Sequence, residues 1–306
     1  MITKKRIVLA VGALALLAAA CSSPDVAATV NNSEISESFV LSIRVGNEGR
    51  DTVSAEQYRN DLSRLIFTEA MLTAAEEDFG LTDLDAPGAG DAFLATVTPQ
   101  EQQFLTTIAQ DPEMSDVAVD VAVTQLLLRS EVRKALAAVE TNIQDVWQND
   151  QGTLIEVCAR HILSATESEA NDVLTRLEAG DDFASVAGEV SLDTTSPGGV
   201  LPCPVSPASF VTPFDAVVAT APVGEPTGPV QTEFGWHIII VDLRESPASL
   251  EELAADPVRW MPPEALDSFW TTWLNDVVER ADIVVRSDIG MWYPPVDGII
   301  PPPPSP

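Results

Sequence analysis

The pattern of apolar residues changes twice along this chain, and no other feature limits its fold as much. Up to about residue 148 the apolar residues recur at helical spacing, as Tyr58, Leu62 and Leu65 do. Between residues 154 and 245, short strand patterns such as the β-branched run Ile238–Val241 alternate with short helical ones. A helical pattern returns over 263–281. We therefore expect an α+β fold, in which helical segments precede and follow a mixed segment.

Capping residues predict where several helices begin. Ser54 is a good N-cap for a helix that runs to Gly80, and Pro99 at a first helical position opens another. Thr166, with Glu169 three residues later, has the spacing of a capping box. A long and mostly helical stretch is predicted over 115–148, and 149–152 reads as a domain boundary.

The first 20 residues have the form of an export signal. Three basic residues at 4–6 precede an apolar run over 7–20, which is short for a permanent membrane span. Small residues then lead directly into Cys21, which resembles a lipoprotein signal and implies cleavage before Cys21 and lipidation of that residue. The alternative is an ordinary secretory signal that happens to precede a cysteine. We expect a signal peptide at 1–20, a lipidated tether at 21–28 and an extracytoplasmic protein anchored to the cell membrane.

The charge of the chain excludes one class of partner. Its 47 acidic and 16 basic residues give a net charge of −31, and removal of the signal with its three basic residues leaves −34. Such a surface repels nucleic acid, so no nucleic-acid partner is expected. Solubility outside the cell explains this charge, and so would a halophilic habitat.

Two histidines, the only ones in the chain, lie beside predicted strands of the mixed segment. A single histidine in such a place is usually a hydrogen-bonded structural residue. Here, however, His161 and His237 belong to a series of short motifs. The series comprises ARHIL at 159–163, GDDFASVA at 180–187, SLD at 191–193, GG at 198–199, VTPF at 211–214, GEPTGPV at 224–230 and TEFGWHII at 232–239.

These motifs, in this order, resemble the parvulin family of peptidyl-prolyl isomerases. The resemblance implies a domain at 154–245 with a four-stranded antiparallel sheet flanked by helices. It places His161 beside His237, with Thr232 supporting the pair and Asp193 near the substrate carbonyl, as the catalytic group. It also implies a pocket for the substrate proline, lined by Leu201, Phe210, Phe214 and Phe234. No cofactor and no metal are implied.

The resemblance breaks down in two places. The family loop usually reads Gly-Gly-Asp-Leu-Gly, whereas residues 198–203 read Gly-Gly-Val-Leu-Pro-Cys. The change could reshape the rim of the site or lower its activity. Some parvulins select phosphorylated substrates with a basic loop, but no Lys or Arg occurs between Arg176 and Arg244. Phosphate-directed specificity is therefore not expected.

The mature chain keeps two cysteines besides Cys21. An even pair in an exported protein favours a disulfide, and we predict one between Cys158 and Cys203. Free thiols are one alternative. A zinc site formed by both cysteines with His161 and His237 is another, although the spacing fits no zinc pattern.

The regions on either side resemble the PrsA/SurA type of exported foldase. Residues 30–36 look like that family's opening hairpin, and the Trp-bearing helix at 263–281 and the strand at 283–285 are placed to return to it. The resemblance implies a helical chaperone domain, formed by 29–152 and 248–292, that holds unfolded chains. The Pro-rich end, 293–306, is expected to be disordered.

Three functions remain open at this stage. The first is an isomerase that acts on X–Pro bonds of exported polypeptides and also holds such chains. The second is a parvulin fold that binds peptide without accelerating rotation. The third is a thiol or metal function of the two cysteines.

Overall fold

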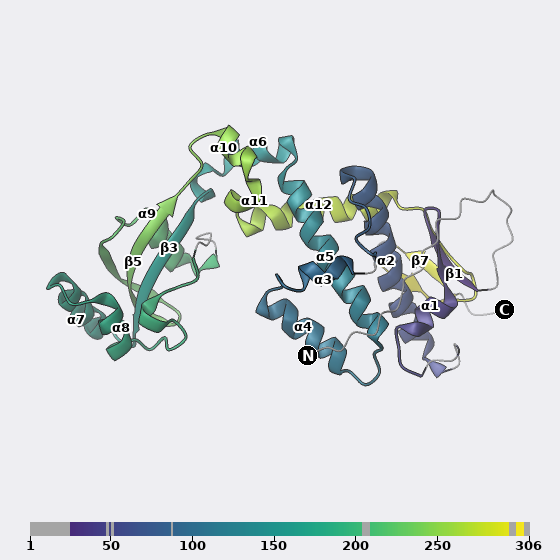
Figure 1. The fold of residues 1–306 in the computed structure, drawn as a ribbon, viewed down its shortest axis with the longest axis horizontal. Helices are drawn as coiled ribbons and strands as arrows, with labels where there is room; N and C mark the ends of the chain where they lie inside the picture. Colours follow the sequence, from purple (N-terminus) through teal and green to yellow (C-terminus); the bar gives the residue numbers. More distant parts are fainter. Residues whose placement is uncertain are drawn as a thin grey trace. The chain divides into compact units, whose positions relative to one another are not determined.

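A computed structural model describes residues 25–46, 49, 52–86, 88–203, 209–293 and 298–302. The chain divides into two compact units (Figure 1). One unit combines residues 1–135 with 270–306, and the other is the contiguous stretch 136–269. The signal, Cys21 and most of the tether predicted at 21–28 lie outside the described residues.

The first unit is mainly helical. Its helices are α1 (Glu37–Ser42), α2 (Ala55–Phe79), α3 (Ala89–Phe93), α4 (Pro99–Gln110), α5 (Asp116–Ala137) and the C-terminal part of α12 (Pro263–Arg280). The predicted start and end of α2 are confirmed, because Ser54 forms a capping box with Gln57 and Gly80 adopts the left-handed conformation at the C-cap. The long and mostly helical stretch predicted over 115–148 is confirmed, and it consists of two helices, α5 and α6 (Glu140–Asn149), because Val139 between them has extended backbone.

The two ends of the chain meet in one sheet of this unit. Strand β1 (Val26–Val30) pairs with β2 (Ser33–Ser36) on one side and with β6 (Ile283–Val285) on the other, both antiparallel. Asn31 has a positive φ of 54° in the turn between β1 and β2, which asparagine tolerates better than most residues. Its side chain accepts a hydrogen bond from the backbone N–H of Asp282 at 3.0 Å. The predicted hairpin and the return of 283–285 to it are confirmed.

Helix α12 is tied to the end of α2 by a carboxylate. Asp78 accepts a hydrogen bond of 2.7 Å from the indole N–H of Trp273 and one of 2.9 Å from Arg280. Trp273 also lies against Phe79, with 6.0 Å between the ring centroids. The C-terminal helix is therefore part of the N-terminal fold.

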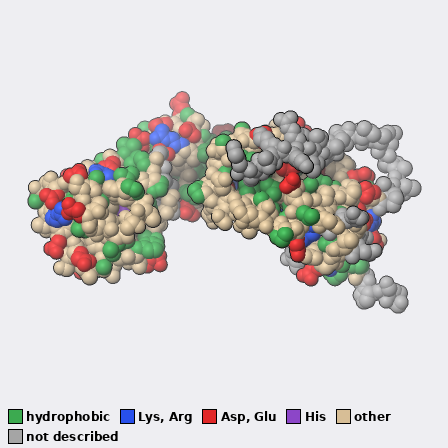
Figure 2. All heavy atoms as spheres, turned by 60° about the horizontal axis from the view of Figure 1, so that its bottom comes forward, with side chains coloured by type: hydrophobic (Ala, Val, Ile, Leu, Met, Phe, Trp, Pro, Cys, Tyr) green, Lys and Arg blue, Asp and Glu red, His purple; other side chains and the backbone are tan. Residues whose placement is uncertain are grey.

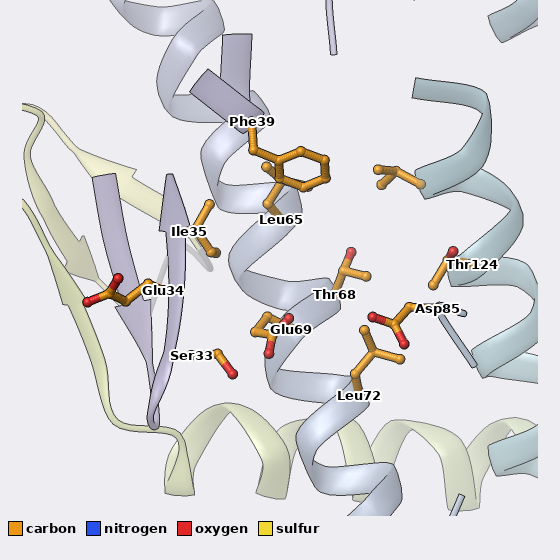
Figure 3. A pocket seen from close by; sticks show the side chains of 11 residues that line it. Ser33, Glu34, Ile35, Phe39, Leu65, Thr68, Glu69, Leu72, Asp85 and Thr124 are labelled. Carbon is orange, nitrogen blue, oxygen red and sulfur yellow. The ribbon is translucent and has the colours of Figure 1, made fainter. Parts of the chain in front are cut away.

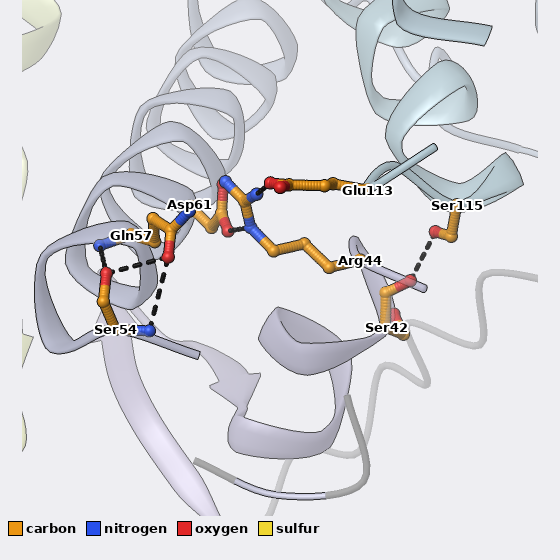
Figure 4. A network of polar contacts seen from close by, with 7 residues as sticks. All are labelled: Ser42, Arg44, Ser54, Gln57, Asp61, Glu113 and Ser115. Atoms are coloured by element: carbon orange, nitrogen blue, oxygen red, sulfur yellow. Dashed lines mark hydrogen bonds and ion pairs between the residues drawn. The ribbon is translucent and has the colours of Figure 1, made fainter. Parts of the chain in front are cut away.

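A buried ion pair fixes the chain around α1 (Figure 4). Arg44 donates to both carboxylate oxygens of Asp61, at 2.6 and 3.3 Å, and Asp61 is only 3% exposed. The same guanidinium reaches Glu113 at 3.4 Å, and Ser115 donates to the carbonyl of Ser42 at 2.5 Å. These contacts join the end of α1 to α2 and to the loop that leads into α5.

Part of the predicted disordered tail forms a strand, which corrects that expectation. Strand β8 (Gly298–Ile300) pairs with β7 (Met291–Tyr293). The backbone N–H of Ile299 donates to Ser63 of α2 at 3.3 Å, and Trp292 lies edge-on to Phe67 of the same helix. The short apolar strand β8 therefore pairs with β7, and both strands contact the surface of α2.

The second unit contains a mixed domain, and its predicted class is confirmed. Its sheet has the order β3-β5-β4, all antiparallel, formed by β3 (Glu156–Ser164), β4 (Pro226–Thr232) and β5 (Gly235–Glu245). We expected four strands, but the described residues form three. The free side of β3 carries only an isolated bridge between Arg160 and Val200, because the loop there turns at Gly198 and Gly199, both of which have positive φ.

Helices cover both faces of this sheet. Ile162, Ile238 and Ile240 pack on one face against α7 (Glu167–Glu178) and α8 (Phe183–Val190). Ala159, Ile239 and Val241 pack on the other face against α9 (Thr212–Thr220). Burial of both faces explains the unbroken apolar run in β5. The capping box at Thr166 and Glu169 is present at the start of α7, as predicted.

The second unit extends beyond the predicted span of 154–245. Helices α6, α10 (Leu250–Ala255) and α11 (Pro257–Trp260) form a separate apolar cluster with Leu154 and the first turns of α12. Arg259 ties this cluster to the ends of β3 and β5, with ion pairs to Glu156 at 2.8 Å and Glu245 at 2.6 Å. The segment that leads into the mixed domain, α6 with Leu154, therefore packs against the segment that leaves it, α10, α11 and the start of α12.

Acidic side chains spread over the visible face of both units (Figure 2). Within the described ranges, no helix is both long and apolar enough to cross a membrane.

Candidate functional site

The register of β3 and β5 brings the two histidines together. Leu163 lies opposite His237, and His161 precedes Leu163 by two residues, so both rings point to the face of the sheet that α9 covers. Both histidines are buried, with exposed fractions of 7% and 4%. Their rings are stacked, and their Nδ1 atoms lie 3.0 Å apart.

Four side chains form one continuous line of hydrogen bonds. Nε2 of His161 lies 2.7 Å from a carboxylate oxygen of Asp193, and Nε2 of His237 lies 2.8 Å from the hydroxyl of Thr232. Thr232 in turn accepts a bond of 3.1 Å from the backbone N–H of Phe234. The structure thus brings together all four residues that the sequence suggested as the catalytic group.

The ends of this line fix its direction when both rings are neutral. An ionised carboxylate can only accept, so His161 donates from Nε2 to Asp193. A neutral ring has one N–H, so Nδ1 of His161 accepts from Nδ1 of His237. Nε2 of His237 then accepts from the hydroxyl of Thr232. Every polar hydrogen points toward Asp193, and the negative charge is held at that end.

The surroundings set the charge states of the two ends. Hydrogen bonds from Ser196, Thr195 and His161 hold the pKa of Asp193 far below its usual range, so the carboxylate is ionised near neutral pH. Burial, with a smaller contribution from His161, lowers the pKa of His237 to about 4. His237 is therefore neutral at pH 7.

The sequence analysis missed the groups that hold Asp193. Ser196 donates to one carboxylate oxygen at 2.7 Å, and Thr195 donates to the other from its hydroxyl at 2.7 Å and from its backbone at 2.9 Å. Ser191 accepts from the backbone N–H groups of Leu163 and Asp193 and so ties this loop to β3. An Asp followed at once by two or three hydroxyl residues is a recognisable turn signal, and it could have predicted these bonds.

Aromatic and apolar side chains lie against the histidine pair. Phe214 of α9 is 4% exposed, and its ring meets His161 and His237 edge-on, with centroid distances of 5.8 and 5.4 Å. The ring centroids of Phe210 and Phe214 are 4.8 Å apart, and Leu201 packs against the same cluster. Phe234 does not join them, because its side chain is 64% exposed.

The loop that carries Leu201 is held close to the strand of His161. A Cβ on Gly199 would lie 2.4 Å from the carbonyl oxygen of His161, so only glycine fits there. The backbone N–H of Leu201 donates to Ala159 at 3.1 Å. Cys158 and Cys203 form a disulfide with 4.8 Å between their Cα atoms. This bond uses both sulfur atoms of the zinc site considered above.

One predicted site and one alternative considered from the sequence have no counterpart to describe. Cys21, the predicted lipidation site, lies outside the described residues. Within the described ranges, no group of three or more His, Cys, Asp or Glu side chains is arranged to hold a metal ion.

Similarity to known proteins agrees with this geometry. Residues 159–243 match the family described as Rotamase, PPIC-type PPIASE domain. Foldase protein PrsA of Halalkalibacterium halodurans is 34% identical over 148 residues, which are 47% of this chain but only 43% of that protein. Foldase protein PrsA of Oceanobacillus iheyensis is 28% identical over 252 residues, covering 80% of this chain and 76% of that protein.

Among solved structures, the peptidylprolyl isomerase PrsA of Bacillus cereus is 22% identical and covers 84% of this chain and 92% of that one, with a TM-score of 0.36. The matched span, 159–243, contains both histidines, Asp193 and Thr232. Residues 159–243 of this chain are a PPIC-type peptidyl-prolyl cis/trans isomerase domain of the parvulin family.

Proposed function

We propose that the chain is a membrane-anchored foldase, which accelerates rotation about X–Pro bonds of exported polypeptides and holds those polypeptides while they fold. The observation that carries the catalytic part is the line of hydrogen bonds from Thr232 through both histidines to Asp193, packed against Phe214. The holding role rests on the helical first unit and on the relatives named PrsA foldase.

Prolyl rotation needs no covalent intermediate and no net transfer of a proton. Its barrier is about 20 kcal/mol, because the planar amide is stabilised by resonance. In the twisted amide this resonance is lost and the dipole of the bond is smaller. An apolar enclosure by Leu201, Phe210 and Phe214 favours the twisted form over the planar one, which water solvates better.

The polar line acts on the amide electrostatically. The N–H groups of both rings are used within the line when the rings are neutral, so the line offers no free proton and no general base. It holds one negative charge, on Asp193, at a fixed place beside the apolar cluster. A fixed charge in a partly desolvated site stabilises charge changes in the twisted amide without reorganisation.

The experiment is NMR exchange spectroscopy on a short Ala-Pro peptide with the mature, unreduced chain. We expect accelerated cis/trans exchange, and Asp193→Asn should lower kcat/KM about tenfold, or ~1.4 kcal/mol. Asp172→Asn, which changes an exposed carboxylate on α7, is the matched control and should leave the rate unchanged.

The same experiment distinguishes the isomerase from the alternative function, a domain that binds peptide without catalysis. If the folded wild-type chain binds the peptide without accelerating exchange, the domain is a silent peptide-binding module. The altered loop at 198–203 favours this alternative, because it borders the site through Gly199 and Leu201.

The membrane anchor is tested separately. Expression of the full chain in a bacterial host with labelled fatty acid should give a lipidated protein, and Cys21→Ser should abolish both the label and the association with membranes. Label that persists on the Cys21→Ser protein would contradict lipidation at this residue.

A further inference from the structure

The helical unit contains a half-open cavity of about 70 Å³ beside the middle of α2 (Figure 3). Helix α2 forms its floor, strand β2 and helix α1 form one wall, and α5 forms the other. A volume of this size holds a few water-sized groups, so it fits one side chain rather than a folded partner.

Most of the wall is apolar. Ile35 and Leu65 are 6% and 4% exposed, and Phe39, Leu72 and Val121 complete the apolar part of the lining. The remaining lining residues are Ser33, Glu34, Thr68, Glu69, Asp85 and Thr124. Two carboxylates lie at the end of the cavity near Leu72: Glu69 on α2, and Asp85 on the loop that follows this helix (Figure 3). The cavity is therefore apolar along its length and acidic at one end.

Glu69 is a partly buried carboxylate that has no cationic partner among the residues that the structure describes. Burial raises its pKa, Asp85 adds to this, and a hydrogen bond from Ser33 opposes it only in part. Over the ranges that the structure describes, no Lys or Arg forms an ion pair with Glu69 or Asp85. Charges that leave water are normally paired, so this end of the cavity suits a cation.

We propose that the cavity binds the side chain of a lysine or arginine in an unfolded polypeptide client. The methylene stem would lie along Ile35, Leu65 and Leu72, and the cationic head would lie at Glu69 and Asp85. Lysine and arginine have this division into an apolar stem and a charged end. The site deepens the proposed holding role and rests on it.

A neutral apolar side chain suits the cavity less well. It would fill the apolar part of the cavity but would displace water from Glu69. Because an apolar group cannot replace the hydrogen bonds of that water, its binding would cost free energy. A cation instead supplies a charge-assisted hydrogen bond to that carboxylate. The net charge of −31 attracts basic segments from a distance as well.

The test is NMR titration of the mature chain with a capped, proline-free heptapeptide that contains one lysine between alanines. The isomerase site is not addressed, because the peptide has no proline. We expect amide shifts at Thr68 and Thr124, and an affinity at least fivefold weaker for the same peptide with acetyl-lysine. Glu69→Gln should weaken the lysine peptide about fivefold, whereas Glu76→Gln, an exposed change on the same helix, should not.

Three results would overturn the proposal: equal binding of the acetylated peptide, equal binding by Glu69→Gln, or shifts that avoid the cavity. Suppression of aggregation of a reduced, unfolded protein is measured in parallel. If the chain suppresses aggregation but the lysine peptide does not bind at the cavity, the inference fails and the holding role stands. If the peptide binds there but aggregation is not suppressed, the cavity binds cations and the holding role fails.

Discussion

Thr232 starts the line of hydrogen bonds at the histidine pair, so removing its hydroxyl should affect the whole line. Thr232→Val keeps the shape but leaves Nε2 of the buried His237 without its donor. We expect a loss of about 1–2 kcal/mol in stability and a several-fold lower kcat/KM, and Thr232→Ser should restore both. Thr220→Val is the control, because that hydroxyl bonds only within its own helix, at an exposed position.

Thermal unfolding and isomerisation kinetics measure these losses. The direction of the line is measured separately by the long-range ¹H–¹⁵N NMR pattern of the imidazole rings, which reports the tautomer of each ring directly. Wild-type protein at pH 8 should carry its proton on Nδ1 of His237 and on Nε2 of His161. The opposite tautomers would show that the line runs the other way.

Asp215 beside the aromatic cluster should make stability depend on pH. Its carboxylate accepts from the backbone N–H of Phe210 at 3.2 Å, and burial raises its pKa to about 6. The folded state therefore binds a proton more tightly than the unfolded state, and stability is lost as pH rises from about 4 through 6.

Asp215→Asn keeps the bond from Phe210 and removes the titration. We expect the variant to be more stable than the wild type by about 1 kcal/mol above pH 7, because the carboxyl is only partly buried, and equal to it below pH 4. Thermal unfolding followed by circular dichroism over pH 4–8 measures this difference. Comparison of the two proteins at each pH cancels the opposite titration of His237, whose pKa is lowered to about 4. A constant difference at all pH values would contradict the assignment.

The sequence located the four polar side chains of the site because the motifs that carry them are short and specific. It did not predict how Asp193 is held, because Thr195 and Ser196 belong to no helix or strand pattern. The resemblance placed Phe234 in the apolar pocket, yet Phe234 is exposed, and its contact with the hydrogen-bond line is through its backbone N–H to Thr232.

At the scale of elements, the loop 191–203 takes the place of the expected fourth strand, and the disulfide anchors its end. Leu201 lies two residues before Cys203 and packs against the apolar cluster that contains Phe214, so we expect the disulfide to position this wall of the site. Reduction should raise KM several-fold and change kcat less, because Asp193, the member of the polar line in this loop, is held by Thr195 and Ser196 rather than by the disulfide.

Steady-state isomerisation kinetics at low temperature, before and after reduction, measures this effect. The control is the double variant Cys158→Ser, Cys203→Ser, which should have the raised KM already and should not respond to reductant. Equal KM for the oxidised and reduced wild type would show that Gly199 and the backbone bond of Leu201 hold the loop without the disulfide.

Helix termini were the best predicted elements, because a capping side chain acts within a few residues of itself. Ser54, Thr166 and Gly80 each mark an observed end. Strand pairing was predicted less well. The tail strand β8 pairs with the nearby β7 and contacts α2, which is more than 200 residues away in sequence, and nothing within residues 298–300 alone indicates either partner.

At the scale of the molecule, the first unit depends on both ends of the chain. A variant that stops after Phe269 loses strand β6 and the bonds of Trp273 and Arg280 to Asp78. We expect calorimetry to show the transition of this unit abolished or moved far down in temperature. The transition and the isomerase activity of 136–269 should remain, and their loss would contradict the independence of the second unit.

The pairing of β1 with β6 also sets an order in time. Synthesis proceeds from the N-terminus, and β1 ends at Val30 whereas β6 begins at Ile283. The first unit must therefore wait, incomplete, until almost the entire chain has emerged. The segment 136–269 is contiguous and can fold as soon as its last residue has been synthesised. The contiguous second unit can therefore fold and act before the first unit, whose residues flank it in sequence, is complete.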